Sequence, residues 1–387
     1  MYRKMGLMFL LAVVTAVIIG TPVSQSTVSA QAVAGPGAAA ATGITTTGAA
    51  NAAQLGAETD AFWTAEKRAA AVSKDIGIAN VGFEAAAAAP AASGTPTAAG
   101  GMAGSEMLVK AAPGLQPTRT GAPLATPVPL DGPFPGPNNT FAYGPKYVTY
   151  PIGTVGKLFF HDPVGGGNFQ CTATVTTGTA AVQNVIWTAG HCVANGGHSY
   201  FYSNFQFCPS YNAGGVNPTR GCWNWNGGAG TPTVWFNNGD LTRDFAFVQL
   251  QSTGTVWATD VGNVTGSVGF AWNWGRDQHW NHFGYPCVAP WDCVHIIQTE
   301  AEHRYDVNIG GSGPFVNSWG SVQNEGSSGS AVLLFFSYGG GFINSNVSFY
   351  FSAGPNGNEH NIELQGPYYD TFACQVWQLG TGFTGTC

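Results

Sequence analysis

A serine flanked by glycines is the residue in this sequence that is best placed to act as a nucleophile. It is Ser328, in the run Gly326-Ser327-Ser328-Gly329-Ser330. A serine hydroxyl attacks a carbonyl carbon only when a base takes its proton and fixed N–H donors stabilise the resulting oxyanion. Because glycine adopts backbone angles closed to other residues, the N–H groups of Gly326 and Ser328 can converge on one oxygen. The run predicts a nucleophile and an oxyanion hole, although glycine- and serine-rich runs are also typical of flexible loops.

The base and the carboxylate that such a serine needs lie upstream. His191 is found in Trp-Thr-Ala-Gly-His-Cys, and Asp244 in Arg-Asp-Phe-Ala-Phe-Val. A carboxylate on one imidazole nitrogen orients the ring while the other nitrogen takes the serine proton. Taken alone, Asp244 beside Arg243 also fits a surface ion pair. The three segments together, in the order His, Asp, Ser, favour a catalytic triad of His191, Asp244 and Ser328.

These segments resemble the chymotrypsin-like (trypsin-like) serine peptidases over residues from about 141 to 387. The resemblance is closest to the bacterial glutamyl-endopeptidase-like branch, whose members carry Gly-x-Ser-Gly-Ser and a Gly-Tyr-Pro like Gly284-Tyr285-Pro286. It implies an all-β fold of two six-stranded antiparallel β-barrels, about 141–255 and about 260–387, with the active site in the cleft between them. Ser327 stands where digestive trypsins have the aspartate that pairs with a freed N-terminus, so activation by that ion pair is not expected.

The same resemblance suggests which residues form the specificity pocket. Six positions before the nucleophile, trypsin-like relatives have an aspartate, and this chain has Val322. Glutamyl-specific relatives have a histidine on the strand after the nucleophile, where the nearest match is Asn346. A pocket that contains Val322, Gln323 and Asn346 would be neutral, and it predicts cleavage after uncharged or apolar residues.

The residues that must hold this site read as short strands. Segments rich in Val, Thr, Phe and Tyr are separated by Gly, Asn and Pro, and no long helical period competes with them. The predicted strands cover 155–160, 170–176, 184–188, 200–207, 245–250, 294–299, 331–336 and 341–351. All eight cysteines and eleven of the twelve tryptophans lie beyond residue 140, which places the packed domain there.

The cysteines indicate disulfides in an exported chain. Cys171 and Cys192 match a bridge of the resembled family beside the histidine. Sequence alone leaves every pairing open, and closure of short loops favours the remaining pairs. The expected bridges are Cys171–Cys192, Cys208–Cys222, Cys287–Cys293 and Cys374–Cys387.

The first 140 residues differ in kind from the rest. Arg3 and Lys4 precede the apolar run 7–19, and Val28-Ser29-Ala30 fits a signal peptidase site, so residues 1–30 are predicted to be a secretory signal. Residues 31–140 are rich in Ala, Gly and Pro, and they are predicted to be a mostly disordered propeptide and linker. Within them, 59–76 has partly helical spacing and resembles propeptides of related bacterial peptidases. It is either a pro-segment helix that docks on the enzyme or a nascent helix in a disordered leader.

Composition limits the partners. Only 9% of residues are charged and the net charge is -7, so nucleic acid is not expected as a partner. The protein is expected to be a secreted, extracellular monomer that acts on protein or peptide substrates, with its own propeptide as a further candidate partner and no membrane association after signal removal. No metal or organic cofactor is expected, because His279 and His282 lack the further ligands that a zinc site needs.

Two other functions fit parts of the sequence. A secreted non-catalytic module on a degenerate peptidase fold could bind peptides or glycans through loop tryptophans: Trp223, Trp225, Trp272, Trp274 and Trp280. That reading predicts a missing triad residue, and none is missing. An esterase of the α/β type would show helices between strands and a histidine after the serine.

Overall fold

The computed structural model describes residues 43–48, 51–79, 85–86, 94–103, 139–142, 145–179, 182–212, 215–323, 325–337, 340–353 and 363–387. The predicted signal segment, residues 1–30, lies outside the described residues, as does most of the predicted linker before residue 139. No helix among the described residues is long and apolar enough to cross a membrane.

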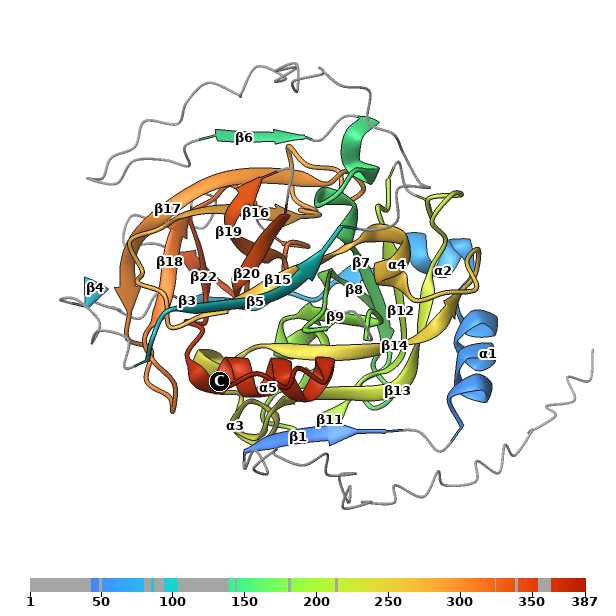
Figure 1. Ribbon diagram of the computed structural model, residues 1–387, viewed down its shortest axis with the longest axis horizontal. Helices are drawn as coiled ribbons and strands as arrows, with labels where there is room; N and C mark the ends of the chain where they lie inside the picture. The colour runs from blue at the N-terminus through green and yellow to red at the C-terminus, as the bar shows by residue number, and fades with distance from the viewer. Residues whose placement is uncertain are drawn as a thin grey trace, which may run out of the picture. The chain divides into compact units, whose positions relative to one another are not determined.

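The first barrel closes on itself through antiparallel pairs. The order is β7–β8–β9–β14–β13–β12, and β12 pairs back to β7 (Figure 1). Closure gives every strand of this barrel two paired neighbours, although β12 covers only the first part of β13, and the inward side chains form one apolar cluster that includes Leu158, Phe160 and Val175. The strands are β7 (Val155–His161), β8 (Asn168–Thr176), β9 (Val185–Thr188), β12 (Ser203–Pro209), β13 (Trp223–Pro232) and β14 (Ala246–Gly254).

The second barrel follows the order β16–β17–β18–β22–β20–β19, and β19 pairs back to β16. The continuation of β20 meets β22 through Ser348 N–H to Gln365 O, 2.9 Å, and Gln365 N–H to Phe349 O, 3.0 Å. The all-β, two-barrel fold class is therefore confirmed. The strands are β16 (His279–Gly284), β17 (Ile297–Val307), β18 (Val316–Gly320), β19 (Ala331–Ser337), β20 (Gly340–Asn346) and β22 (Glu363–Gly366).

Other elements flank the barrels. The strand β15 (Ser267–Trp272) pairs in parallel with β20 and with β8, and the minor strands are β10 (Ala194–Asn195), β11 (Tyr200–Phe201) and β21 (Tyr350–Ala353). The helices of this region are α3 (Thr233–Asn238), α4 (Val261–Thr265) and α5 (Thr371–Thr381), with 3-10 turns η2 (Pro145–Val148), η3 (Ile152–Thr154), η4 (Gly190–Cys192) and η5 (Leu241–Arg243).

Several strands were not predicted from the sequence: β13, β15, β16, β18 and β22. Gly, Asn and Trp interrupt the β-branched pattern in β13 and β16, so their strand character depends on neighbours that complete the barrels. Four of the five tryptophans considered for glycan binding are buried core residues: Trp223, Trp225, Trp272 and Trp280. Packing therefore accounts for them.

The described residues of the leader include strands that were not predicted from the sequence, and the predicted disorder of residues 31–140 as a whole stays a prediction. The strands of the leader add to parts of other strands that still have an open side: β1 (Ile44–Thr47) pairs with β13, β5 (Thr97–Met102) with β15, and β6 (Asn139–Ala142) and β4 (Ala85–Ala86) with β17. Figure 1 shows β1 and β5 lying along the barrel strands. A segment with few large side chains gains order here because main-chain hydrogen bonds to a preformed edge need no apolar side chains.

The predicted helical stretch at 59–76 is only partly helical. Two helices, α1 (Ala52–Phe62) and α2 (Ala65–Ala69), are followed by extended strands β2 (Val72–Ser73) and β3 (Gly77–Ala79). Trp63 is 3% exposed, and its Nε1–H donates to Asn204 O at 2.6 Å. Arg68 donates to Gln206 Oε1 at 2.8 Å. These contacts with β12 favour the docking interpretation over the nascent helix.

Candidate active site

His191 and Asp244 lie in direct contact at the ends of two paired strands. His191 is in η4, directly after β9, and Asp244 ends η5, directly before β14. Since β9 and β14 are hydrogen-bonded neighbours, the two residues meet at the same end of the first barrel. Nδ1 of His191 lies 2.7 Å from Asp244 Oδ2, and the His191 backbone N–H donates to Asp244 Oδ1 at 2.7 Å. This carboxylate therefore controls both the position and the ring orientation of the histidine.

Asp244 does not form a surface ion pair with its neighbour Arg243. Asp244 is 0% exposed, and Arg243 instead forms a bidentate pair with Asp370, at 2.8 and 2.9 Å. Ser348 Oγ–H donates to Asp244 Oδ2 at 2.5 Å, and Asn346 Nδ2–H donates to the Asp244 carbonyl oxygen at 3.1 Å. Donors from the second barrel thus hold a carboxylate that belongs to the first.

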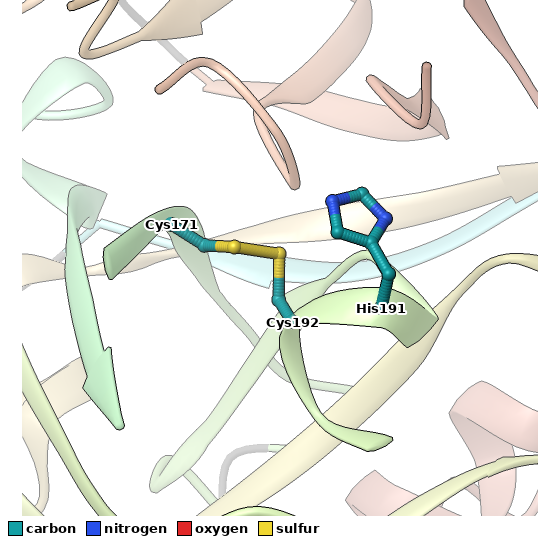
Figure 2. Close-up of side chains that lie close together, drawn as sticks. All are labelled: Cys171, His191 and Cys192. Carbon is teal, nitrogen blue, oxygen red and sulfur yellow. A yellow bond between two sulfur atoms is a disulfide. The ribbon is translucent and has the colours of Figure 1, made fainter. Parts of the chain in front are cut away.

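Disulfide Cys171–Cys192 braces the turn that carries the histidine, as Figure 2 shows. The two sulfurs and His191 lie close together, but bonded sulfurs offer no thiolate, so this group is not a metal site. In the chain-entropy model, a loop of this length contributes roughly 3 kcal/mol to the free energy of unfolding. All four expected bridges are confirmed, the others being Cys208–Cys222, Cys287–Cys293 and Cys374–Cys387.

The loop that carries Ser328 requires glycine at two positions. Gly326 has φ +93°, and a Cβ there would lie 2.4 Å from Cys287 Sγ and from Tyr285 O. Gly329 has φ +80°, and its Cβ would lie 2.0 Å from Thr188 Oγ1. Both the left-handed backbone and the lack of space exclude larger residues. The close approach at Gly329 brings this second-barrel loop against the strand that leads to His191.

Thr172 connects the same loop to the first barrel. Its backbone N–H donates to Ser328 O at 2.8 Å, and its Oγ1–H donates to Gly326 O at 3.1 Å. Its own carbonyl oxygen accepts from Thr188 Oγ1–H at 2.8 Å. These bonds tie the serine loop and the strand before the histidine to one residue, which fixes their relative position.

A piece of the leader lies at these groups. The carbonyl oxygen of Lys74 accepts from Nε2 of His191 at 3.1 Å. Asp75 Oδ1 accepts from the Gly326 backbone N–H and from Ser328 Oγ–H, both at 2.8 Å. Burial raises the pKa of the Asp75 carboxyl, and the hydrogen bonds from Gly326 and Ser328 oppose that shift. The Gly326 N–H and the Ser328 hydroxyl therefore converge on one acidic oxygen, and a role of the Ser328 N–H as the second oxyanion donor stays a prediction.

The residues predicted for the specificity pocket lie near the serine loop. The side-chain amides of two of them, Gln323 and Asn346, are hydrogen-bonded to other buried groups of the protein. Gln323 Nε2 donates to His282 O, Ile297 O and Thr299 Oγ1 inside the second barrel. Asn346 Oδ1 accepts from Tyr369 Oη–H at 2.6 Å, so its amide is used to hold Asp244 and Tyr369. Val322 is partly exposed, and its carbonyl oxygen accepts from Trp291. A pocket role for these residues stays a prediction.

Three participants were missed by the sequence reasoning. Thr172 follows Cys171, but a threonine in a strand gives no sign that it will hold the Ser328 loop against the first barrel. Ser348 lies in the strand-like run Val-Ser-Phe-Tyr, where a serine does not by itself indicate a functional role. Asp75 lies in the leader, whose Ala-, Gly- and Pro-rich composition does not indicate a role at the site.

Comparison with known proteins supports the fold. No protein-family model matches the sequence, and no curated protein matches it. Among solved structures, a thermostable serine protease from an extremophilic microorganism matches with 28% identity and a TM-score of 0.51, covering 60% of this chain and 98% of that one. The protease Anisep from Arthrobacter nicotinovorans matches with 25% identity and a TM-score of 0.51, covering 63% of this chain and 100% of that one. A Glu endopeptidase shares 18% identity over 63% of this chain and 96% of its own, with a TM-score of 0.45, and it carries no inference about residue preference.

Proposed function

Because this chain has the chymotrypsin-like serine protease fold, we propose that it is a serine endopeptidase that hydrolyses peptide bonds through an acyl-enzyme. One observation carries the proposal. Gly326 N–H and Ser328 Oγ–H both donate to a single carboxylate oxygen, Asp75 Oδ1, at 2.8 Å. A backbone N–H that holds an acidic oxygen next to a serine hydroxyl is placed as one of the donors that an oxyanion formed at that serine requires.

In the proposed reaction, Ser328 Oγ attacks the carbonyl carbon of the scissile bond while Nε2 of His191 takes the serine proton. The tetrahedral oxyanion is held by the Gly326 and Ser328 N–H groups, and each such donor is worth about 3 to 4 kcal/mol in enzymes of this class. His191 then gives the proton to the leaving amine, which breaks the C–N bond and leaves the acyl group on Ser328. A water molecule, deprotonated by His191, hydrolyses that ester. Throughout, Asp244 keeps the imidazole oriented and stabilises its charged form.

A fluorophosphonate provides the test. In enzyme from which the leader has been removed, the reagent is expected to phosphonylate Ser328 and to abolish peptide hydrolysis in parallel, because only an activated serine reacts with it. Peptide mapping by mass spectrometry locates the label. A label on Ser327 or Ser330, or full hydrolysis after complete labelling of Ser328, would contradict the assignment.

We also propose that the chain is exported and matures by loss of its leader. Four disulfides fit an oxidising compartment. The change in composition near residue 140 predicts that the mature N-terminus lies between about residues 110 and 150. N-terminal sequencing of the active secreted protein measures this directly. Active enzyme that still begins at Gln31 would exclude maturation by leader removal.

A further inference from the structure

Residues 72–79 of the leader run between the two barrels, across the candidate catalytic residues. At one end, β2 pairs in parallel with β8 of the first barrel, and Lys74 N–H donates to Gln170 O at 3.1 Å. At the other end, β3 pairs in parallel with β21, and Tyr350 N–H donates to Ile76 O at 3.1 Å. The main chain is thus held on both sides of the point where Lys74 and Asp75 meet His191 and Ser328.

Apolar and cationic side chains add to this attachment. Ile76 and Ile78 pack against a buried cluster of Val307, Val316, Phe349 and Phe351. The Lys74 ammonium lies over the Phe169 ring, 4.2 Å from its centroid. The helices α1 and α2 dock on the first barrel, so the segment is delivered at the high effective concentration of a tethered ligand.

The group at the nucleophile is not one that a serine can cleave. The acceptor of the Ser328 and Gly326 bonds is a side-chain carboxyl, and the scissile bond of a substrate would have to present a main-chain carbonyl carbon there. His191 is occupied as well. Its Nδ1 lies 2.7 Å from Asp244 Oδ2, and its Nε2 lies 3.1 Å from the Lys74 carbonyl oxygen. The nitrogen that would take the Ser328 proton is therefore already in contact with the leader.

Assuming the proposed peptidase activity, we propose that residues 72–79 are a tethered inhibitor that binds the catalytic cleft without being cleaved, with the Asp75 carboxylate in the place of the reaction's oxyanion. The inhibitor engages three catalytic groups at once: the oxyanion donor at Gly326, the hydroxyl of Ser328 and the Nε2 of His191. Activity therefore requires that this segment leave the cleft, not only that the linker be cut, because β1 and β5 continue to hold the leader through main-chain pairs after a cut.

The test uses the full-length secreted chain and short exposures to a fluorescent fluorophosphonate, with the label counted only in the intact band on a denaturing gel. Asp75→Ala is expected to raise the labelling rate of Ser328 about tenfold or more over wild type. Each hydrogen bond to a charged group shifts the equilibrium between bound and released leader by roughly one to two orders of magnitude, and Asp75→Ala loses the two bonds to Gly326 and Ser328. Asp75→Asn keeps the shape but loses the charge, and it is expected to label at an intermediate rate.

The matched control is a carboxylate of α1 that does not contact the first barrel. Asp60 itself contacts Gln206 of the first barrel, so Glu58→Ala serves as the matched control: it removes an exposed carboxylate of α1 that accepts from Gln54 on the same helix, and it is expected to label at the wild-type rate. In intact wild-type protein, mass spectrometry should find the Lys74–Asp75 and Asp75–Ile76 bonds uncut. Should Asp75→Ala fail to fold, Asp75→Asn carries the comparison.

The outcomes separate the inhibitor from the enzyme. If both Asp75 variants label at the wild-type rate while removal of the leader accelerates labelling and yields hydrolysis, the inhibitor role of Asp75 is wrong and the peptidase stands. Cleavage on either side of Asp75 within the cleft would also overturn it. If Ser328 stays unlabelled and no peptide is hydrolysed after the leader has been removed, the proposed function itself fails.

Discussion

Ser328→Ala is expected to lower turnover roughly 10⁶-fold, with little change in the KM for a peptide substrate. The variant retains the cleft and the Gly326 N–H, but it has no hydroxyl to form the acyl-enzyme. Turnover is measured with a fluorogenic peptide after the leaders of wild type and variant have been removed by the same added protease. An added protease is needed because an inactive variant cannot remove its own leader.

His191→Ala should cost about as much as Ser328→Ala, and the double variant little more. The two residues act in one step, in which the hydroxyl is useful only while Nε2 takes its proton. Ser330→Ala is the control. Its hydroxyl is buried in the same loop and has no hydrogen-bond partner among the described residues, so near-wild-type turnover is expected. Near-normal activity of Ser328→Ala, or additive losses in the double variant, would mean that the triad assignment is wrong.

Asp244→Asn is expected to lower turnover about 10⁴-fold while leaving the fold intact. Three donors surround this carboxylate: the His191 backbone N–H at 2.7 Å, the His191 Nδ1–H at 2.7 Å and the Ser348 hydroxyl at 2.5 Å. An asparagine amide places its NH₂ against one of them. The clash is relieved when the histidine carries its proton on Nε2 instead of Nδ1, and in that form the ring cannot accept the proton of Ser328.

Asp240→Asn is the control, because it makes the same change on the same loop. It distinguishes a loss of turnover caused by the histidine from a loss caused by a less stable loop. Asp240 Oδ1 accepts from Thr242, and its Oδ2 accepts from Ser312, without contacting His191. Its turnover is expected to stay within about tenfold of wild type, the range of a loss that acts only through stability. Circular dichroism and the urea unfolding midpoint measure stability for both variants. Equal losses of turnover in the two variants would show that Asp244 acts only by holding the loop.

The sequence by itself determined the local chemistry of the site. The positive φ angles of Gly326 and Gly329 belong to a turn of a few adjacent residues, so the glycines on both sides of Ser328 could be read locally, although the lack of space for a Cβ comes from distant residues. The histidine and aspartate lie next to strands whose β-branched and aromatic residues made their ends predictable. Short loops between cysteines made three of the disulfide pairs the economical choice, and the family resemblance supplied Cys171–Cys192.

Other parts of the fold depended on distant neighbours. The strands β13, β16 and β18 carry Gly, Asn or Trp in place of a clear alternation, and they are strands because flanking strands complete their hydrogen bonds. Residues Val72 to Ile76 are extended for the same reason, because neighbouring strands complete their hydrogen bonds. Helical spacing continues through these residues, but pairing with β8 and β21 outweighs a weak local preference.

Only the tertiary structure decided which residues meet at the site. Ser348 reaches Asp244 from the other barrel, Thr172 holds the Ser328 loop, and Asp75 reaches Gly326 and Ser328 from far upstream in the chain. Each contact joins a polar side chain to a backbone group or to another side chain more than a hundred positions away. Such a contact leaves no periodicity or composition signal, because its energy comes from the closed barrels that bring the two groups within hydrogen-bond distance and exclude water from them.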